Sequence, residues 1–345
     1  MGKKISKYII PLILILVVSI IISASVGSAN LSLKETTVII ASFIPGINYF
    51  INDSDINPQS EKIIAQIRLP RILLAIFVGI ELASAGVIFQ GIFRNPMADP
   101  YIIGVSAGAS LGETVGMIMI SGIRFLSFSS ASIFAFAGAI GVTFIVYNIS
   151  RIRSKISVVT LLLAGVAISA FISSINSFIL IFKTQDFAKV IFWLMGGLTS
   201  ASWQQFFMIS PVIVLLLVVS GFFMKDLNLI SLSDDRASQM GVETERVKKV
   251  LLVLASLIAA AAVSVSGIIG FVGLITPHIM RLLIGPNHKN LFPASAVAGG
   301  IVLLFSDTIA RTVLAPREIP VGIITSIIGV PFFIYLLLRS KKEIF

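Results

Sequence analysis

Two carboxylates and two histidines are the side chains whose types could support chemistry within the apolar part of this chain. Glu81 and Glu113 lie inside long apolar runs, where an ionisable group is by default a functional candidate, for example as a proton carrier. They either face a watery cavity or are protonated and packed. His278 and His288 lack metal-ligand spacing and neighbouring carboxylates, and we interpret His278 as a packing residue.

Several signatures of enzymes are missing from the sequence. It contains no G-x-x-x-x-G-K-[ST] motif, so the chain cannot cradle and hydrolyse ATP by itself. It contains no cysteine, which excludes disulfides, thiol catalysis and thiolate metal sites. No convergent pair of catalytic acids is apparent. We therefore predict a protein without catalytic residues, cofactor or metal site of its own.

Composition indicates where such a chain resides. Of its 345 residues, 57% are hydrophobic and 12% are charged, whereas soluble domains carry about 25% charged residues. A helix needs about 20 mostly apolar residues to cross a bilayer. The composition excludes a soluble enzyme, a DNA-binding module and a disordered scaffold, and predicts an all-α, multi-pass membrane protein formed by one domain over residues 1–345.

Ten apolar runs predict about ten transmembrane helices. They fall near 8–27, 71–92, 101–121, 129–149, 157–182, 204–224, 248–266, 268–285, 293–313 and 320–339. Glycines 267, 270 and 273 leave open whether 248–285 forms two spans or one broken helix. The first run follows three lysines and resembles a signal peptide, but its length favours a retained helix.

The distribution of basic residues predicts the orientation. If the N-terminus is cytoplasmic, 17 of the 26 Lys and Arg residues lie on the inner side, although the long 28–67 loop lies outside. This is the bias of the positive-inside rule. Both termini are therefore predicted to be cytoplasmic, and the net charge of +10 reflects topology rather than nucleic-acid binding.

The strongest local motif follows the second run. Residues 94–100 read RNPMADP and are followed by GVSAG at 104–108. Asn-Pro and Asp-Pro end one helix and cap the next, while small residues allow close helix packing. From physical considerations alone, this segment is a turn between two helices.

With its surroundings, this motif resembles a known family. RLPRILLAIFVG (68–79), FQGIFRNPMADPYIIGVSAGASLG (89–112), LLLAGVAIS (161–169) and GFVGLITPHIMRLLIGP (270–286) are similar to the iron–siderophore and vitamin B12 (FecCD/BtuC-type) permeases of ABC importers. The resemblance implies a homodimer with the translocation path at its interface. It also implies two separate cytoplasmic ATP-binding subunits and an extracytoplasmic binding protein. The implied substrate is a metal chelate, most often iron(III)–siderophore, with haem, cobalamin and molybdate left open.

The polar inner stretch 225–247 mixes apolar residues with charges. Such a stretch can lie on lipid headgroups, but in the family this position resembles coupling helices that insert into a groove on the ATPase. Gly241 is predicted to end the helix with a left-handed cap. The predicted coupling residues are Leu227, Leu229, Ile230, Leu232, Ala237, Met240 and Gly241.

Three arginines are candidates for docking the binding protein. Arg68, Arg71 and Arg311 match family positions that receive acidic residues of its two lobes, and the planar guanidinium grips a carboxylate through two bonds. The alternatives are interface anchoring for Arg68 and Arg71, and pairing with Asp307, four residues earlier, for Arg311.

The translocation path is assigned to two segments by the same resemblance. Ser169, Ser173, Asn176 and Ser177 form a polar stripe at helical spacing, although serines also pack helices together. Met195, Gly196 and Gly197 are predicted to form part of an outer gate.

We therefore predict the permease subunit of an ATP-driven importer, multi-pass in the cell membrane, surrounded by membrane lipid. Its mechanism is alternating access without covalent chemistry. One alternative is a secondary transporter driven by ions through Glu81 and Glu113. Another is a membrane receptor or scaffold without transport.

Overall fold

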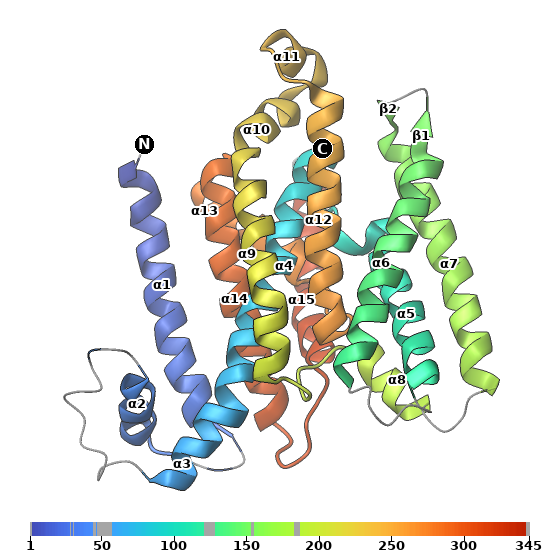
Figure 1. Ribbon diagram of the computed structural model, residues 1–345. Helices are drawn as coiled ribbons and strands as arrows, with labels where there is room; N and C mark the ends of the chain where they lie inside the picture. The colour runs from blue at the N-terminus through green and yellow to red at the C-terminus, as the bar shows by residue number, and fades with distance from the viewer. Residues whose placement is uncertain are drawn as a thin grey trace.

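The apolar runs form helices, because lipid offers no hydrogen-bond partner to an open backbone. The computed structural model describes residues 2–27, 29, 31–43, 46, 57–120, 128–152, 155–182 and 187–342. Each of the ten predicted runs coincides with one helix (Figure 1). These are α1 (Gly2–Ser25), α4 (Leu69–Phe93), α5 (Val105–Ile120), α6 (Phe128–Ser150), α7 (Val158–Phe182), α9 (Trp203–Phe222), α12 (Thr244–Ser266), α13 (Val272–Ile284), α14 (His288–Thr312) and α15 (Val321–Lys342).

Within the described residues, eight of the helical segments are long and apolar enough to cross a membrane. The helices α5 and α13 are shorter, at 16 and 13 residues. A helix rises about 1.5 Å per residue, so α13 is about 20 Å long and cannot span a hydrocarbon core of about 30 Å by itself.

Short elements connect the long helices. On the outer side these are α2 (Leu33–Ser42), α3 (Pro58–Lys62) and the π-helical turn η3 (Ile63–Arg68), which continues directly into α4. A 3-10 turn, η4 (Pro100–Ile103), precedes α5, and the strands β1 (Arg151–Ile152) and β2 (Lys155–Ile156) pair antiparallel between α6 and α7. The remaining elements are α8 (Phe187–Leu194), α10 (Met224–Leu232) and α11 (Asp234–Gln239).

Helix α4 lies at the centre of the bundle and packs against α12, α13 and α14. Glycines make this possible. A Cβ atom at Gly79 would lie 2.2 Å from the carbonyl oxygen of Gly299, and one at Gly86 would lie 1.8 Å from that of Gly273. Only residues without a side chain permit such close backbone contact, which is a common way to join helices in lipid.

The segment 248–285 forms two helices rather than one. Residues 267–271 are not helical, and Gly267 and Phe271 adopt left-handed φ angles of 66° and 68°. A Cβ atom at Gly267 would lie 2.1 Å from the carbonyl oxygen of Trp193. The break therefore sits directly against the end of α8.

The RNPMADP segment forms the predicted turn. Arg94 ends α4 with a φ of 51°, and the side chain of Asp99 caps η4 by accepting a hydrogen bond from the amide of Tyr101 at 2.8 Å. The small residues that follow pack closely, because a Cβ atom at Gly108 would lie 2.4 Å from the carbonyl oxygen of Gly138 on α6. Both expectations from this motif are confirmed.

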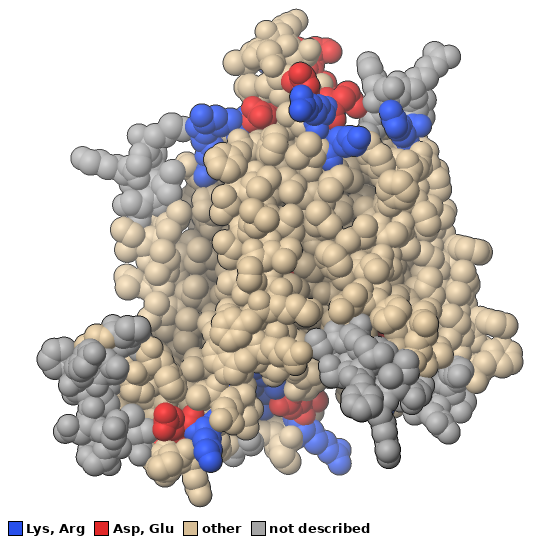
Figure 2. Space-filling view, in the orientation of Figure 1, with Lys and Arg blue, Asp and Glu red and all other residues tan. Residues whose placement is uncertain are grey.

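Both chain termini lie towards the end of the bundle that carries α10 and α11 (Figure 1). On the face shown in Figure 2, charged side chains gather at the two ends and leave an uncharged band between them. This pattern fits a protein whose middle is immersed in lipid. The distribution of basic residues predicts that the α10–α11 end faces the cytoplasm, and it is called the inner end below, with the opposite end called the outer end.

Candidate functional sites

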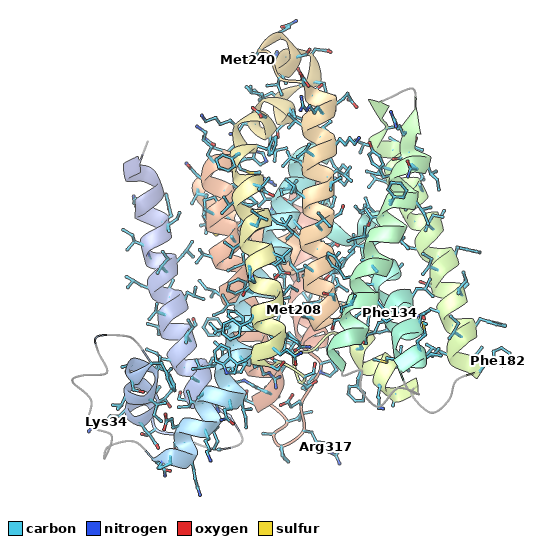
Figure 3. The ribbon with its side chains drawn as sticks, in the orientation of Figure 1. Lys34, Phe134, Phe182, Met208, Met240 and Arg317 are labelled. Carbon is cyan, nitrogen blue, oxygen red and sulfur yellow. The ribbon has the colours of Figure 1, made fainter. Side chains whose placement is uncertain are left out.

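The inner stretch forms two short helices that protrude from the bundle (Figure 1). Leu227, Ile230 and Ala237 are buried in the chain's own core. Leu232 and Met240 are 69% and 68% exposed, and Met240 lies at the tip (Figure 3). Of the seven predicted coupling residues, these two therefore present the apolar surface, whereas Leu229 is half-buried.

The end of α11 has the predicted form. Gly241 adopts a left-handed φ of 83°, and the amide of Val242 donates to the carbonyl of Ala237 at 3.0 Å. This left-handed ending turns the chain sharply into α12. At the other end of α11, the hydroxyl of Ser233 caps the helix by accepting from the amide of Arg236 at 3.0 Å.

Asp234 connects α11 to two long helices. Its carboxylate accepts from Lys248 Nζ of α12 at 2.6 Å and from Arg94 Nη2 at the end of α4. Arg94 Nε also donates to the carbonyl of Ile230 on α10 at 2.8 Å. A movement of α10 and α11 is thus opposed by charge-assisted bonds to α4 and α12.

Asn228 of α10 connects this pair of helices to a third long helix. Its Nδ2 donates to Asn287 Oδ1 at 3.1 Å, and its Oδ1 accepts from the amide of His288 at 2.8 Å. Asn287 is the N-cap of α14. The helices α10 and α11, which carry the exposed Leu232 and Met240, are therefore bonded to α4, α12 and α14.

At the outer end, one buried carboxylate organises the predicted docking arginines. Asp307 is fully buried and pairs with Arg71 Nη2 at 2.9 Å and with Arg311 Nε at 3.7 Å. The second pair is the contact that the spacing of four residues between Asp307 and Arg311 predicts. Arg71 also pairs with Glu318 at 2.9 Å, so its guanidinium bridges α14 and the segment before α15.

The other two arginines are engaged by backbone groups near the end of α1. Arg68 donates to the carbonyls of Ala24 and Ala29. Arg311 donates to the carbonyl of Ser23 and to its hydroxyl oxygen, the latter at 2.7 Å. Both side chains are buried. Arg68 and Arg311 are therefore not at the surface. Of the three docking candidates, Arg71 is the one that borders an open space.

That open space is a cavity of about 320 Å³ at the outer end, lined in part by Arg71, Trp193, Gly196, Gly197 and Glu318. It lies where α8 and the segment after it meet the end of α12 and the start of α15. Its lining includes both predicted gate glycines and the predicted docking residue Arg71.

Three chain segments meet closely at the predicted gate. Gly196 has a left-handed φ of 68°, the amide of Gly197 donates to the carbonyl of Ser266 at 2.8 Å, and a Cβ atom at Gly322 would lie 2.3 Å from the carbonyl oxygen of Met195. Met195 itself is partly exposed. A shift of any one segment would be transmitted to the other two.

The predicted polar stripe of α7 divides between two environments. Asn176 is buried and donates to Ser110 Oγ of α5 at 2.6 Å, so it packs helices together. Ser173 and Ser177 are exposed, and Ser177 bonds back to the carbonyl of Ser173 at 2.9 Å. Ser169 is half-buried. Helix α7 lies at the edge of the molecule (Figure 1), and of the four stripe residues Ser173 and Ser177 are the two on its exposed face.

The two carboxylates within the apolar runs are buried. Glu81 on α4 is fully buried and Glu113 on α5 is 1% exposed. Among the described residues, their carboxyl oxygens have no hydrogen-bond partner. Neither residue lines the outer cavity, nor a second cavity at the inner end.

Asp234, Glu318 and Asn228 were not singled out from the sequence. Asp234 and Arg94 are separated by 140 positions, and Arg71 and Glu318 by 247. Neither pair has a local spacing that would reveal it. Only Asp307 had a readable signal, namely its position four residues before Arg311.

The chain is similar in sequence to known transport proteins. A model of the FecCD transport family matches residues 15–339. The chain is 42% identical over 278 residues to the cobalamin import system permease of Halobacterium salinarum, covering 81% of this chain and 74% of that protein. It is 36% identical over 336 residues to the hemin transport system permease of Yersinia pestis, covering 96% and 95%.

A solved structure is also similar. It is described as an inward-facing conformation of a metal-chelate type ABC transporter, and it superposes with a TM-score of 0.83 at 32% identity. The match covers 96% of this chain and 99% of the other. The similarity therefore extends over almost the entire bundle.

Proposed function

The chain belongs to the FecCD transport family, and we propose that it is the membrane-spanning subunit of an ATP-driven importer for an iron(III)–siderophore. Membership makes it a multi-pass permease of the cytoplasmic membrane. The observation that carries the proposal is the apolar surface of Leu232 and Met240, held by Asp234 against α4 and α12. An exposed apolar surface on a rigid support is suited to a protein partner.

The partner at this inner surface is a cytoplasmic ATP-binding subunit, one for each permease copy. Leu232 and Met240 enter a groove on that subunit, in the way that an amphipathic helix docks into a hydrophobic groove. Leu227, Leu229, Ile230, Ala237 and Gly241 act indirectly, since they hold α10 and α11 in place. ATP hydrolysis takes place on the partner, and this chain transmits the movement.

A second copy of the chain completes the translocation path. Helices α7 and α15 are the candidates for this contact, because both expose large apolar side chains such as Leu163 and Ile327. The exposed serines of α7, Ser173 and Ser177, then border the path, with Ser169 beside them and Asn176 as their support. Met195, Gly196 and Gly197 form the outer gate.

An extracytoplasmic binding protein delivers the chelate at the outer end. Arg71 is its principal contact in this proposal, because it lines the open cavity. Arg68 and Arg311 contribute to docking indirectly, because their bonds to Ala24 and Ser23 hold the end of α1 beside Arg71. A carboxylate of the binding protein would compete with Glu318 for the guanidinium of Arg71.

This competition predicts opposite effects of two substitutions on docking. Arg71→Gln should weaken binding of the loaded binding protein by about tenfold or more, because a charge-assisted hydrogen bond is lost. Glu318→Gln should strengthen it several-fold, because the competing carboxylate is removed. Binding to immobilised complex in nanodiscs is the measurement, with Arg246→Gln at the opposite end as the matched control. Unchanged affinity in a folded Arg71→Gln complex would remove Arg71 from the docking surface.

The inner surface predicts a defect in coupling. Replacing Leu232 and Met240 by Asp should leave the permease folded, because both side chains are exposed, but should uncouple ATP hydrolysis from transport. Hydrolysis and uptake are measured on the same proteoliposomes, with Leu232→Met as the control that keeps the apolar bulk. If the double variant retains normal coupling, the contact lies elsewhere.

The proposed function is tested by uptake into proteoliposomes that contain this chain, its ATPase and its binding protein. Labelled ferric siderophores, haem, cobalamin and molybdate are offered with and without ATP. We expect ATP-dependent accumulation of a ferric siderophore. Accumulation of another ligand would correct the substrate and retain the importer.

The same vesicles test the ion-coupled alternative. Glu81 and Glu113 are buried without a described partner, and this is the observation that keeps the alternative in view. Uptake that ignores ATP, follows an imposed proton gradient and disappears in Glu81→Gln would overturn the ATP-driven mechanism. We expect Glu81→Gln, which preserves shape, to leave ATP-driven uptake largely intact.

A further inference from the structure

Two carboxylates bind Arg71, and they differ in exposure. Arg71 Nε and Nη2 donate to Asp307 at distances between 2.9 and 3.1 Å, and Nη1 donates to both carboxylate oxygens of Glu318 at 2.9 Å. The side chain of Asp307 is fully buried, whereas that of Glu318 is 36% exposed. One partner of Arg71 is therefore fixed within the bundle, and the other is accessible from outside.

This difference in exposure makes the two ion pairs unequal in how easily they break. Removing one partner from a buried pair leaves an uncompensated charge and is costly, whereas water and salt compete with an exposed pair. If another carboxylate replaces Glu318, Arg71 keeps Asp307 and gains a new partner, and the released Glu318 is solvated. The arrangement therefore allows Glu318 to be exchanged without leaving a buried charge unpaired.

Glu318 belongs to the segment that joins α14 to α15. Residues 313–318 of this segment are all exposed. The amide of Ile319 donates to the carbonyl of Ala310 on α14 at 2.9 Å, and the side chain of Glu318 adds the ion pair to Arg71 on α4. Through Glu318, α4 thus helps to hold the start of α15 in place.

The same segment lines the outer cavity beside the gate. Glu318 and residues 319–321 line it together with Gly196 and Gly197. The next residue, Gly322, contacts the gate itself, since its amide donates to the carbonyl of Gly196 at 3.4 Å. The chain is therefore in backbone contact with the gate only four residues after Glu318.

We propose that the ion pair between Glu318 and Arg71 holds the outer gate closed, and that the docked binding protein opens the gate by replacing Glu318 with a carboxylate of its own. Release of Glu318 frees residues 318–321, and the contact between Gly322 and Gly196 passes this movement to the gate. Asp307 is a positioning residue, because it keeps Arg71 in place in both states. The inference rests on the proposed docking at Arg71.

A single introduced thiol can report on the gate, because the chain contains no cysteine. Ser266 lines the outer cavity and is 2% exposed, and its carbonyl accepts the bond from Gly197. In Ser266→Cys the thiol is shielded while the gate is closed, and reacts with a charged methanethiosulfonate reagent once the gate segment moves. Thr199→Cys, at an exposed position of the same cavity, controls for access of the reagent.

The first measurement uses the assembled transporter without the binding protein. Glu318→Gln should raise the modification rate at position 266 several-fold, because a neutral amide holds Arg71 more weakly than a carboxylate. Arg71→Gln should raise it similarly, since it removes the other member of the pair. The matched control is Arg317→Gln, next to Glu318 in the same exposed loop (Figure 3), and should leave the rate unchanged.

The second measurement adds loaded binding protein at a saturating concentration. With Glu318 present, docking should raise the modification rate several-fold. In Glu318→Gln docking should add little, because the ion pair that it displaces is already weakened. If Ser266→Cys fails to fold, Leu198→Cys serves as the reporter, since Leu198 is 1% exposed and lines the same cavity.

Two results would overturn the proposal. One is an equal rate in Glu318→Gln and Arg317→Gln without the binding protein, which would show that Glu318 does not hold the gate. The other is the same further increase on docking with and without Glu318, which would place the signal elsewhere. A failure of docking at Arg71 is recognised separately, because Arg71→Gln would then bind the loaded protein with unchanged affinity.

Discussion

The structure depends on the close approach of α4 to α13 and α14. The backbone of α4 lies so near to these helices, at Gly79 and Gly86, that no Cβ atom fits between them. The contact fixes the position of α4 along both neighbours, because a shift would bring side chains into the space where only glycine fits. Helix α4 carries Arg71 at its outer end and Arg94 at its inner end, so the two ends of the molecule share one rigid element.

Each end of α4 is held by carboxylates from elsewhere in the chain, two at the outer end and one at the inner end. Outside, Asp307 and Glu318 hold Arg71. Inside, Asp234 holds Arg94 together with Lys248. Breaking a buried ion pair by removing one partner is costly, so α14 is expected to move with α4 rather than past it. The Asp234 pairs are partly exposed and join α11 and α12 to α4 more weakly. For the alternating access that we propose, this arrangement offers a mechanical route from the outer cavity to Leu232 and Met240.

Much of the fold is readable from the sequence, because lipid imposes one solution on long apolar runs. The ten runs, the RNPMADP turn and the cap at Gly241 were predicted from local chemistry. The environment of individual side chains was not. Leu227 and Leu232 look alike in the sequence, but one is buried and the other exposed, and Arg68 is satisfied by carbonyls 44 and 39 positions away. Such contacts depend on which helices become neighbours, and no local spacing reveals that.

The claim that this chain relays a signal through α4 is tested most directly by ATP hydrolysis in complexes that carry Asp234→Asn. This substitution weakens the bonds to both Arg94 and Lys248 while leaving Leu232 and Met240 unchanged. The measurement is the stimulation of hydrolysis by loaded binding protein in proteoliposomes. We predict that stimulation falls several-fold, while basal hydrolysis and the affinity for the binding protein remain as in the unmodified complex. Full stimulation in the variant would contradict the relay.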